Sequence, residues 1–168
     1  MEEEALDFLL MQNDNEWLGG YVRWFTDVPA RNAYPMTVIF PIDDEMTTIT
    51  VGGKPPGDLG PPPWAMRGVK KRLTAPYFRT LMYSNTYDGE VAAEVLGTKR
   101  KGKIGIVGKG MISATFYEQL KKSLPEATLI EATDLVDQIK AIKSEEEIRS
   151  GCWRKIYNVL FIKRRLIL

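Results

Sequence analysis

The 168 residues are enough for one ordinary domain with a hydrophobic core and too few for two full domains. A hydrophobic content of 44%, a charged content of 27% and a formal net charge of +1 are typical of a globular protein and give no reason to expect nucleic acid or an anionic membrane as a partner. The absence of histidine excludes Ser-His and Cys-His nucleophile systems and histidine-bearing metal sites within this chain, and the single cysteine excludes an internal disulfide.

The N-terminal sequence MEEEALDFLLM is acidic where a secretory signal would be basic, and the chain has no apolar run of about 18 residues. These two features predict a cytoplasmic protein. Acidic residues gather in runs at positions 2–4, 43–45 and 145–147. Solvated faces, turns and helix starts explain such runs better than a carboxylate-only metal site or a catalytic carboxylate pair.

The first third of the chain predicts four strands. An apolar run at residues 5–11 ends in the turn cluster QNDN, and residues 17–25 contain a glycine pair among aromatic and β-branched residues. Residues 36–40 and 47–51 flank the turn PIDDE, which predicts an antiparallel hairpin. Residues 52–63 contain five prolines and four glycines, so we expect an irregular surface connection there.

Residues 64–84 place basic side chains among aromatic ones. The basic residues are Arg67, Lys70, Lys71 and Arg72, and the aromatic residues are Trp64, Tyr77 and Phe78. This combination can bind single-stranded nucleic acid, but the near-neutral net charge favours a solvated surface. We therefore expect neither nucleic acid nor membrane as a partner.

The second half of the chain alternates helical and strand patterns. Val91, Val95 and Leu96 form a helical stripe that ends at Gly97. The elements predicted after it are a strand at 103–107, a helix at 112–124, a strand at 127–130 and a helix at 134–142. This alternation indicates an α/β layer architecture with parallel strand pairing.

The segment KIGIVGKGMIS contains the sharpest local motif. Gly108, Gly110 and Ser113 stand between a strand and a helix in nearly the G-x-G-x-x-G spacing of dinucleotide-binding folds, and Glu131 follows at the end of the next strand. An NAD-binding module is therefore the alternative function. Against it, the turn comes two-thirds of the way along the chain, after an antiparallel region, where a tight strand-to-helix turn explains the glycines.

The segment IKAIKSEEEI, residues 139–148, indicates the start of a helix. Ser144 and Glu147 have the S-x-x-E spacing of a capping box, and acidic residues are favourable near the positive end of a helix. We therefore expect a helix to begin at about residue 145.

The same segment resembles the junction in creatinase, prolidase and Xaa-Pro aminopeptidase relatives, where an N-terminal domain leads into a metallopeptidase domain. The order of motifs over residues 6–148, above all over 103–148, also resembles the N-terminal domain of this M24 family. The resemblance implies an α/β fold, a creatinase N-terminal-like (ribonuclease H-like) mixed β-sheet flanked by helices. It implies a single domain over residues 1–142, followed at 143–168 by the junction and a C-terminal helix.

The resemblance also implies a function. The domain would be a non-catalytic accessory domain that supports homodimerisation and partly encloses the active site of a C-terminal pita-bread domain, which is missing here. The two divalent metal ions expected in that domain have no ligand motif in this chain, so we expect no catalytic residue, cofactor or metal site here. The parent protein would be a metal-dependent Xaa-Pro peptidase.

In related enzymes the aromatic strand and its following loop can reach substrate. In this sequence that implication directs attention to Trp24, Arg31 and Tyr34 as residues at the edge of a substrate site. Buried aromatic packing and a surface arginine are the simpler explanation of the same residues.

The chain departs from the family pattern at both ends. Only residues 1–4 stand in place of the helix that usually precedes the first strand. After Ile148 the sequence reads RSGCWRKIYNVLFIKRRLIL, which carries none of the metal-ligand motifs. This tail is either a helix with one apolar face, which favours self-association over membrane contact, or the product of a frameshifted or truncated reading frame.

Overall fold

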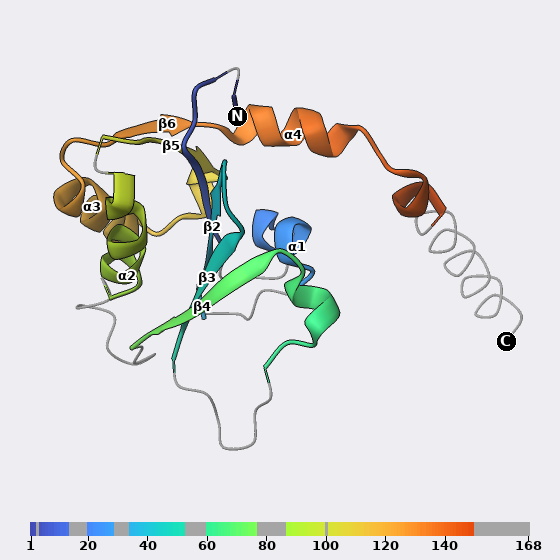
Figure 1. Ribbon diagram of the computed structural model, residues 1–168, viewed down its shortest axis with the longest axis horizontal. Helices are drawn as coiled ribbons and strands as arrows, with labels where there is room; N and C mark the ends of the chain where they lie inside the picture. The colour runs from blue at the N-terminus through green and yellow to red at the C-terminus, as the bar shows by residue number, and fades with distance from the viewer. Residues whose placement is uncertain are drawn as a thin grey trace, which may run out of the picture. The chain divides into compact units, whose positions relative to one another are not determined.

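The computed structural model contains one six-stranded mixed sheet with helices on both faces (Figure 1). It describes residues 1–2, 4–13, 20–28, 34–52, 60–76, 87–99 and 101–149. The chain divides into two compact units, Met1–Thr133 and Asp134–Leu168. The whole sheet belongs to the first unit.

The elements alternate in type as the second half of the sequence predicts. Along the chain they are β1 (Phe8–Asn13), α1 (Tyr21–Thr26), β2 (Met36–Pro41), β3 (Met46–Val51), the 3-10 turn η1 (Pro63–Met66), β4 (Val69–Ala75), α2 (Tyr87–Leu96), η3 (Gly97–Lys99), β5 (Lys103–Val107), η4 (Lys109–Met111), α3 (Ala114–Ser123), β6 (Thr128–Glu131) and α4 (Thr133–Ala141). The strand order is β4-β3-β2-β1-β5-β6. Strands β1, β2 and β3 pair antiparallel, whereas the pairs β3–β4, β1–β5 and β5–β6 are parallel.

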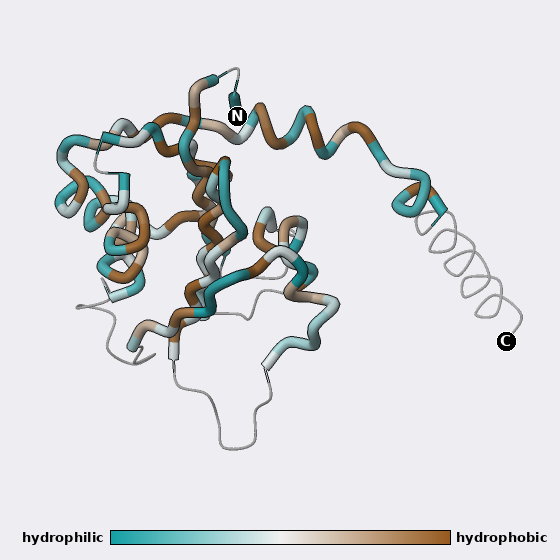
Figure 2. Tube along the Cα trace, in the orientation of Figure 1, coloured by the Kyte–Doolittle hydropathy of each residue, from teal (hydrophilic) through white to brown (hydrophobic). Residues whose placement is uncertain are grey.

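The main core lies between the sheet and the helix pair α2 and α3. Apolar residues of the central strands and of both helices form it, which Figure 2 shows as brown segments on the sheet and on these helices. Its fully buried members include Leu10, Ile39, Ile49, Ile104, Ile106, Phe116 and Leu120. Burial of large side chains at the strand and helix periods is the main force that holds this architecture together.

The opposite face of the sheet carries α1. Phe25 of α1 packs on Phe40 of β2 with ring centroids 5.4 Å apart. Val22 and Thr26, one turn apart, are the buried residues of this helix. The predicted strand at residues 17–25 is therefore wrong over 21–25, and residues 17–19 lie outside the described part. The aromatic and β-branched residues favour a strand locally, but burial of one helical face overrides that preference.

Most of the other sequence predictions for the first unit are confirmed. The hairpin of β2 and β3 is confirmed, as are the strands β5 and β6 and the helices α2 and α3. Strand β1 is confirmed as well, but it continues through Gln12 and Asn13, where the sequence predicts a turn; residues 14–15 lie outside the described part. Strand β4 was not predicted, because the run Lys70-Lys71-Arg72 breaks the alternation of polar and apolar residues. These three side chains are exposed, as a solvated basic surface requires.

Strand β4 contains a β-bulge. Met46 of β3 aligns with Val69, and the next residue, Thr47, already aligns with Lys71, so Lys70 is the extra residue. The Lys70 side chain reaches back to Asp44 at 3.0 Å. The bulge changes which side chains face each surface of the sheet, so Val69 and Leu73 lie on opposite faces although they are four residues apart.

The second unit confirms the helix start predicted at residue 145. The Ser144 N–H donates to the Glu147 carboxylate at 2.9 Å, and the Glu147 N–H donates to the Ser144 hydroxyl at 3.1 Å. This reciprocal pair is a capping box, and residues 145–149 are helical. Helix α4 matches the helix predicted at 134–142.

Phe116→Ala tests the main core. Phe116 is fully buried between α3 and the sheet, so its loss should lower the free energy of unfolding by about 3–5 kcal/mol. Urea unfolding followed by fluorescence measures the change. Glu118→Ala, at an exposed position of the same helix, should stay within about 0.5 kcal/mol. Equal losses in the two variants would contradict this assignment of the core.

Substitutions at Ser144 test the capping box. The Ser144 N–H is the main cause that lowers the pKa of Glu147 from its ordinary 4.5. A lowered pKa stabilises the helix above pH 4.5, and this contribution disappears as the pH falls through the lowered pKa. Ser144→Ala keeps the N–H and should leave the pKa of Glu147 low, whereas Ser144→Pro removes it and should let the pKa rise. NMR titration of Glu147 separates these outcomes, and equal pKa values in both variants would refute the assigned donor.

Candidate functional site

The carboxyl ends of β1 and β5 lie side by side because these two strands pair in parallel. The chain leaves β1 toward α1 on one face of the sheet and leaves β5 toward α3 on the other face (Figure 1). In open α/β sheets, ligands bind at such switch points, outside the carboxyl ends of the strands. This end of the sheet is therefore the first candidate site, and it contains the glycine motif.

The glycine turn is closed by internal contacts. Gly108 has a φ of +66°, and a Cβ atom at this position would lie 2.7 Å from the Tyr21 ring of α1. Its N–H donates to the Thr133 hydroxyl at 2.9 Å. The N–H groups of Met111 and Ile112 donate to carbonyls within the turn, so the chain forms the 3-10 turn η4. The N–H groups of Gly108, Met111 and Ile112, which could otherwise bind a phosphate, thus donate to protein oxygens instead.

Two more residues of the motif, Ser113 and Glu131, also have structural partners. The Ser113 hydroxyl caps α3 by accepting a hydrogen bond from the Phe116 N–H at 3.2 Å. The Glu131 carboxylate accepts hydrogen bonds from the N–H and the hydroxyl of Thr133. In a dinucleotide site this acidic residue would bind ribose instead.

The dinucleotide-binding alternative stays a prediction, but the geometry gives it little support. A pyrophosphate at the turn would have to displace the Tyr21 ring from Gly108 and take the Gly108 N–H from Thr133. Gly110 differs from Gly108 in that a Cβ atom there would have no neighbour within 4 Å. The geometry favours a tight turn in which Gly108 supplies a backbone conformation that other residues rarely adopt.

A buried polar cluster lies next to this turn, and sequence reasoning did not find it. The Gln12 side-chain amide donates to the Asp88 carboxylate at 2.8 Å and to the Thr37 hydroxyl at 3.1 Å. Its oxygen accepts the Ser113 N–H at 3.2 Å. Gln12, Thr37 and Asp88 are 2%, 1% and 4% exposed. The available signals were a glutamine directly after an apolar run and an aspartate just before a helical stripe, and both are common.

Asp88 is the one ionisable member of this cluster. Burial raises the pKa of its carboxyl above the ordinary value of 3.8, while hydrogen bonds from the Gly89 N–H and from Gln12 partly oppose the shift. A shifted pKa in a buried polar group is typical of functional sites and also of structural clusters. The contacts here join β1, β2, α2 and the start of α3.

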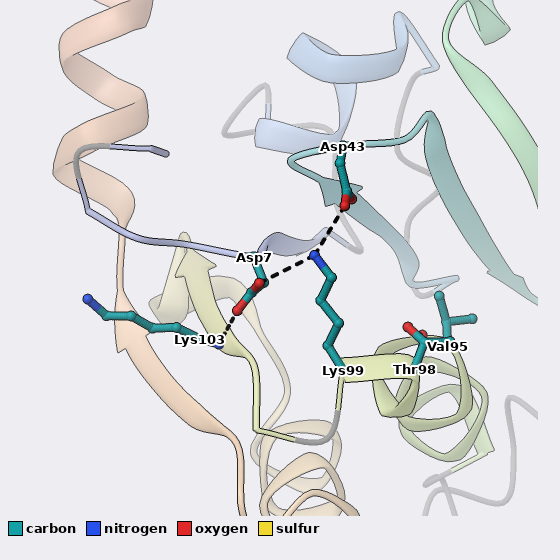
Figure 3. A network of polar contacts seen from close by, with 6 residues as sticks. All are labelled: Asp7, Asp43, Val95, Thr98, Lys99 and Lys103. Atoms are coloured by element: carbon teal, nitrogen blue, oxygen red, sulfur yellow. Dashed lines mark hydrogen bonds and ion pairs between the residues drawn. The ribbon is translucent and has the colours of Figure 1, made fainter.

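An ion cluster fastens the opposite end of β1 (Figure 3). The Lys99 ammonium lies 3.3 Å from Asp7 and 3.3 Å from Asp43, and the Asp7 carboxylate also accepts the Lys103 N–H at 2.8 Å. The pairing with Asp43 is the main cause that raises the pKa of Lys99. These groups are partly exposed and have ordinary ion-pair geometry, so they indicate a structural role.

The structure describes two of the three residues proposed at a substrate edge. Trp24 is 40% exposed on α1, and its ring packs edge-on against Phe25 with centroids 4.9 Å apart. Tyr34 is 38% exposed and lies beside Gly52 at the end of β3. Arg31 lies outside the described residues. Trp24 and Tyr34 thus have different neighbours, and each exposes more than a third of its surface.

The sequence has no histidine, and among the described residues no three Cys, Asp or Glu side chains are arranged to hold a metal ion. None of the described helices combines the length and the hydropathy needed to cross a bilayer.

The architecture is a mixed sheet flanked by helices, of the kind found in the N-terminal domains of prolidases, and solved structures share it. A proline dipeptidase from Streptococcus pneumoniae TIGR4 is 14% identical with a TM-score of 0.57, over 84% of this chain and 92% of that one. An X-Pro aminopeptidase from Thermotoga maritima MSB8 is 12% identical with a TM-score of 0.57, over 88% of this chain and 37% of that one. A prolidase from Thermococcus sibiricus is 11% identical with a TM-score of 0.56, over 88% and 36%.

These comparisons confirm the creatinase N-terminal-like fold expected from the sequence. The chain spans little more than a third of the Thermotoga and Thermococcus structures. No protein-family model and no curated protein matches the sequence. At identities this low, the similarity establishes the shared fold and leaves activity to be argued from residues.

Gly108→Ala tests the closed glycine turn. Because of the positive φ and the Tyr21 ring, the new methyl group should lower the free energy of unfolding by more than about 1 kcal/mol. Gly110→Ala is the matched control, with open space at its Cβ, and should stay within about 0.5 kcal/mol. Urea unfolding measures both variants. Equal stability of the two would show that the turn is not closed on Tyr21.

Proposed function

We propose that this chain is a non-catalytic accessory domain, which supports dimerisation and partly encloses the active site of a two-metal Xaa-Pro peptidase domain. The observation that carries the proposal is the fold shared with a proline dipeptidase, an X-Pro aminopeptidase and a prolidase, which extends over 84–88% of this chain. The capping box at Ser144 adds support, because it forms the helix start expected where such a domain leads onward.

The side chains of this chain suit a domain that encloses an active site better than one that catalyses a reaction. Among the described residues, the most completely buried ionisable group is Asp88, which accepts hydrogen bonds from Gln12 and Gly89 inside the first unit. Without histidine, the chain cannot complete the Asp, His and Glu ligand set implied for the two metal ions. Those ions and the reacting groups would belong to the other domain.

The α1 face of the sheet is the surface that we assign to the active site. Trp24 presents an exposed ring there, and its contact with Phe25, which in turn packs on Phe40, restricts its movement. A fixed aromatic ring can contact an apolar substrate side chain with little loss of conformational entropy. The opposite face is covered by α2 and α3 and forms the main core.

Dimerisation has support from exposed apolar side chains in the first unit. Besides Trp24, the described part of this unit exposes large hydrophobic side chains at Tyr34, Ile42 and Trp64. Aromatic residues are enriched at the centres of protein interfaces. Sedimentation equilibrium of the full chain measures this part of the proposal directly, with a dimer as the expected result.

The enclosing role is tested first at the level of DNA. The coding region around and beyond codon 148 should be read in all three frames for the Asp, Asp, His, Glu, Glu ligand series. If the series is present, the joined protein is assayed for cleavage of an Xaa-Pro dipeptide with divalent metal. Its absence from every frame and from partner proteins co-purified with this chain would remove the proposal.

Trp24→Ala in the joined protein tests the assigned surface. Loss of the ring should raise KM several-fold and change kcat less, because the ring contributes to binding and does not touch the reacting atoms. Tyr87→Ala is the matched control, since it removes an exposed aromatic ring on α2, at the other face of the sheet. Equal effects of the two substitutions would contradict the assignment of the α1 face.

A further inference from the structure

The buried cluster around Gln12 has features that the proposed function does not use. It connects the first turn of α2 to the sheet through one ionisable side chain, Asp88. We propose that Asp88 and Gln12 form a proton-controlled latch, which holds the first turn of α2 firmly against β1 and β2 when Asp88 is neutral and loosely when it is ionised. This inference is independent of any peptidase domain, because all its groups lie in the first unit.

Every polar group of the Gln12 side chain already has a hydrogen-bond partner within the fold. Its two amide hydrogens go to Asp88 at 2.8 Å and Thr37 at 3.1 Å, and its oxygen accepts the Ser113 N–H at 3.2 Å. Gln12 and Thr37 are register partners on β1 and β2, which fixes the two side chains next to each other. The donor to Asp88 of α2 is therefore part of the rigid centre of the sheet, and any change in the contact must come from Asp88 and its helix.

The position of Asp88 makes the ionised form of its carboxyl unfavourable. Its side chain is 4% exposed, and its two oxygens accept hydrogen bonds from the Gly89 N–H at 2.9 Å and from Gln12. The hydrogen-bond partners of its carboxyl are uncharged: the Gly89 N–H of α2 itself and the amide of Gln12 from β1. Gln12 in turn contacts the uncharged Thr37 hydroxyl of β2 and the Ser113 N–H before α3. On α2 itself the nearest acidic residue, Glu90, is exposed. No cation among the described residues contributes to the shift of its pKa.

Ionisation therefore weakens the latch. A neutral carboxyl still accepts hydrogen bonds from Gln12 and Gly89, since each oxygen keeps acceptor capacity. The ionised carboxylate accepts the same bonds, but its negative charge is buried away from water, and this desolvation is unfavourable. The raised pKa of Asp88 has burial as its first cause, so the penalty outweighs the gain from stronger hydrogen bonds. The stabilisation is complete below the ordinary value of 3.8 and is lost as the pH rises through the raised pKa.

Helices α2 and α3 pack closely beside the latch. A Cβ at Gly89, the residue after Asp88, would lie 3.0 Å from the Gln119 side chain and 3.4 Å from the Phe116 carbonyl. The two helices thus approach closely directly beside the latch. Opening of the first turn of α2 removes this contact, while the inner part of α3 remains buried through Leu120.

Hydrogen–deuterium exchange of the full chain between about pH 4 and about pH 7 tests the latch. After correction for the intrinsic pH dependence of exchange, protection of amides in the first turn of α2 should fall several-fold as the pH rises. Protection of amides around Leu120 in α3 should not follow this change. In Asp88→Asn, which removes the charge, the fall should disappear. In Glu94→Gln, an exposed acid on the same helix, it should remain.

NMR titration of the Asp88 carboxyl in the unmodified chain keeps the proposal testable if Asp88→Asn does not fold. A midpoint above 3.8 together with the pH-dependent protection supports the latch. A midpoint at or below 3.8, or protection that is the same at both ends of the pH range, overturns it. Neither outcome bears on Trp24 or on a metal domain, so the latch and the proposed function can fail separately.

Discussion

The pairing of β1 with two neighbours of opposite direction is the constraint on which the rest of the molecule depends. β1 runs antiparallel to β2 and parallel to β5, and all six of its residues are buried. A strand buried on both faces needs apolar residues at nearly every position, and FLLM supplies them. The antiparallel strands β1, β2 and β3 and the parallel strands β1, β5 and β6 therefore share this one strand, and both layers of helices pack on it.

Polar groups fasten β1 at its two ends. Asp7, just before the strand, accepts a hydrogen bond from Lys103 and faces Lys99, while Gln12 near the other end joins β2, α2 and α3. The first cluster is partly exposed and is screened by solvent, whereas the second is buried and sensitive to a single proton. Electrostatic interactions at the exposed end of β1 are thus much weaker than those at its buried end.

Sequence periodicity was sufficient for the elements whose burial follows one regular pattern. The hairpin of β2 and β3 and the units from α2 to α4 were recognised in this way, as was the capping box at Ser144. It failed at α1, where aromatic residues favour a strand until tertiary burial of Val22 and Thr26 is taken into account. It also failed at Gln12 and Asp88, which are 76 residues apart in sequence, because only the fold brings them together.

The bulge of β4 has a consequence for how copies of this protein can meet. β4 is the last strand on its side of the described sheet, and it presents three consecutive cations and one residue out of register. A second copy brought alongside would meet like charges and a broken hydrogen-bond ladder, so continuation of the sheet from chain to chain is disfavoured. Association by way of side chains on a face of the domain remains open, which allows a closed pair to form without the risk of a growing fibre.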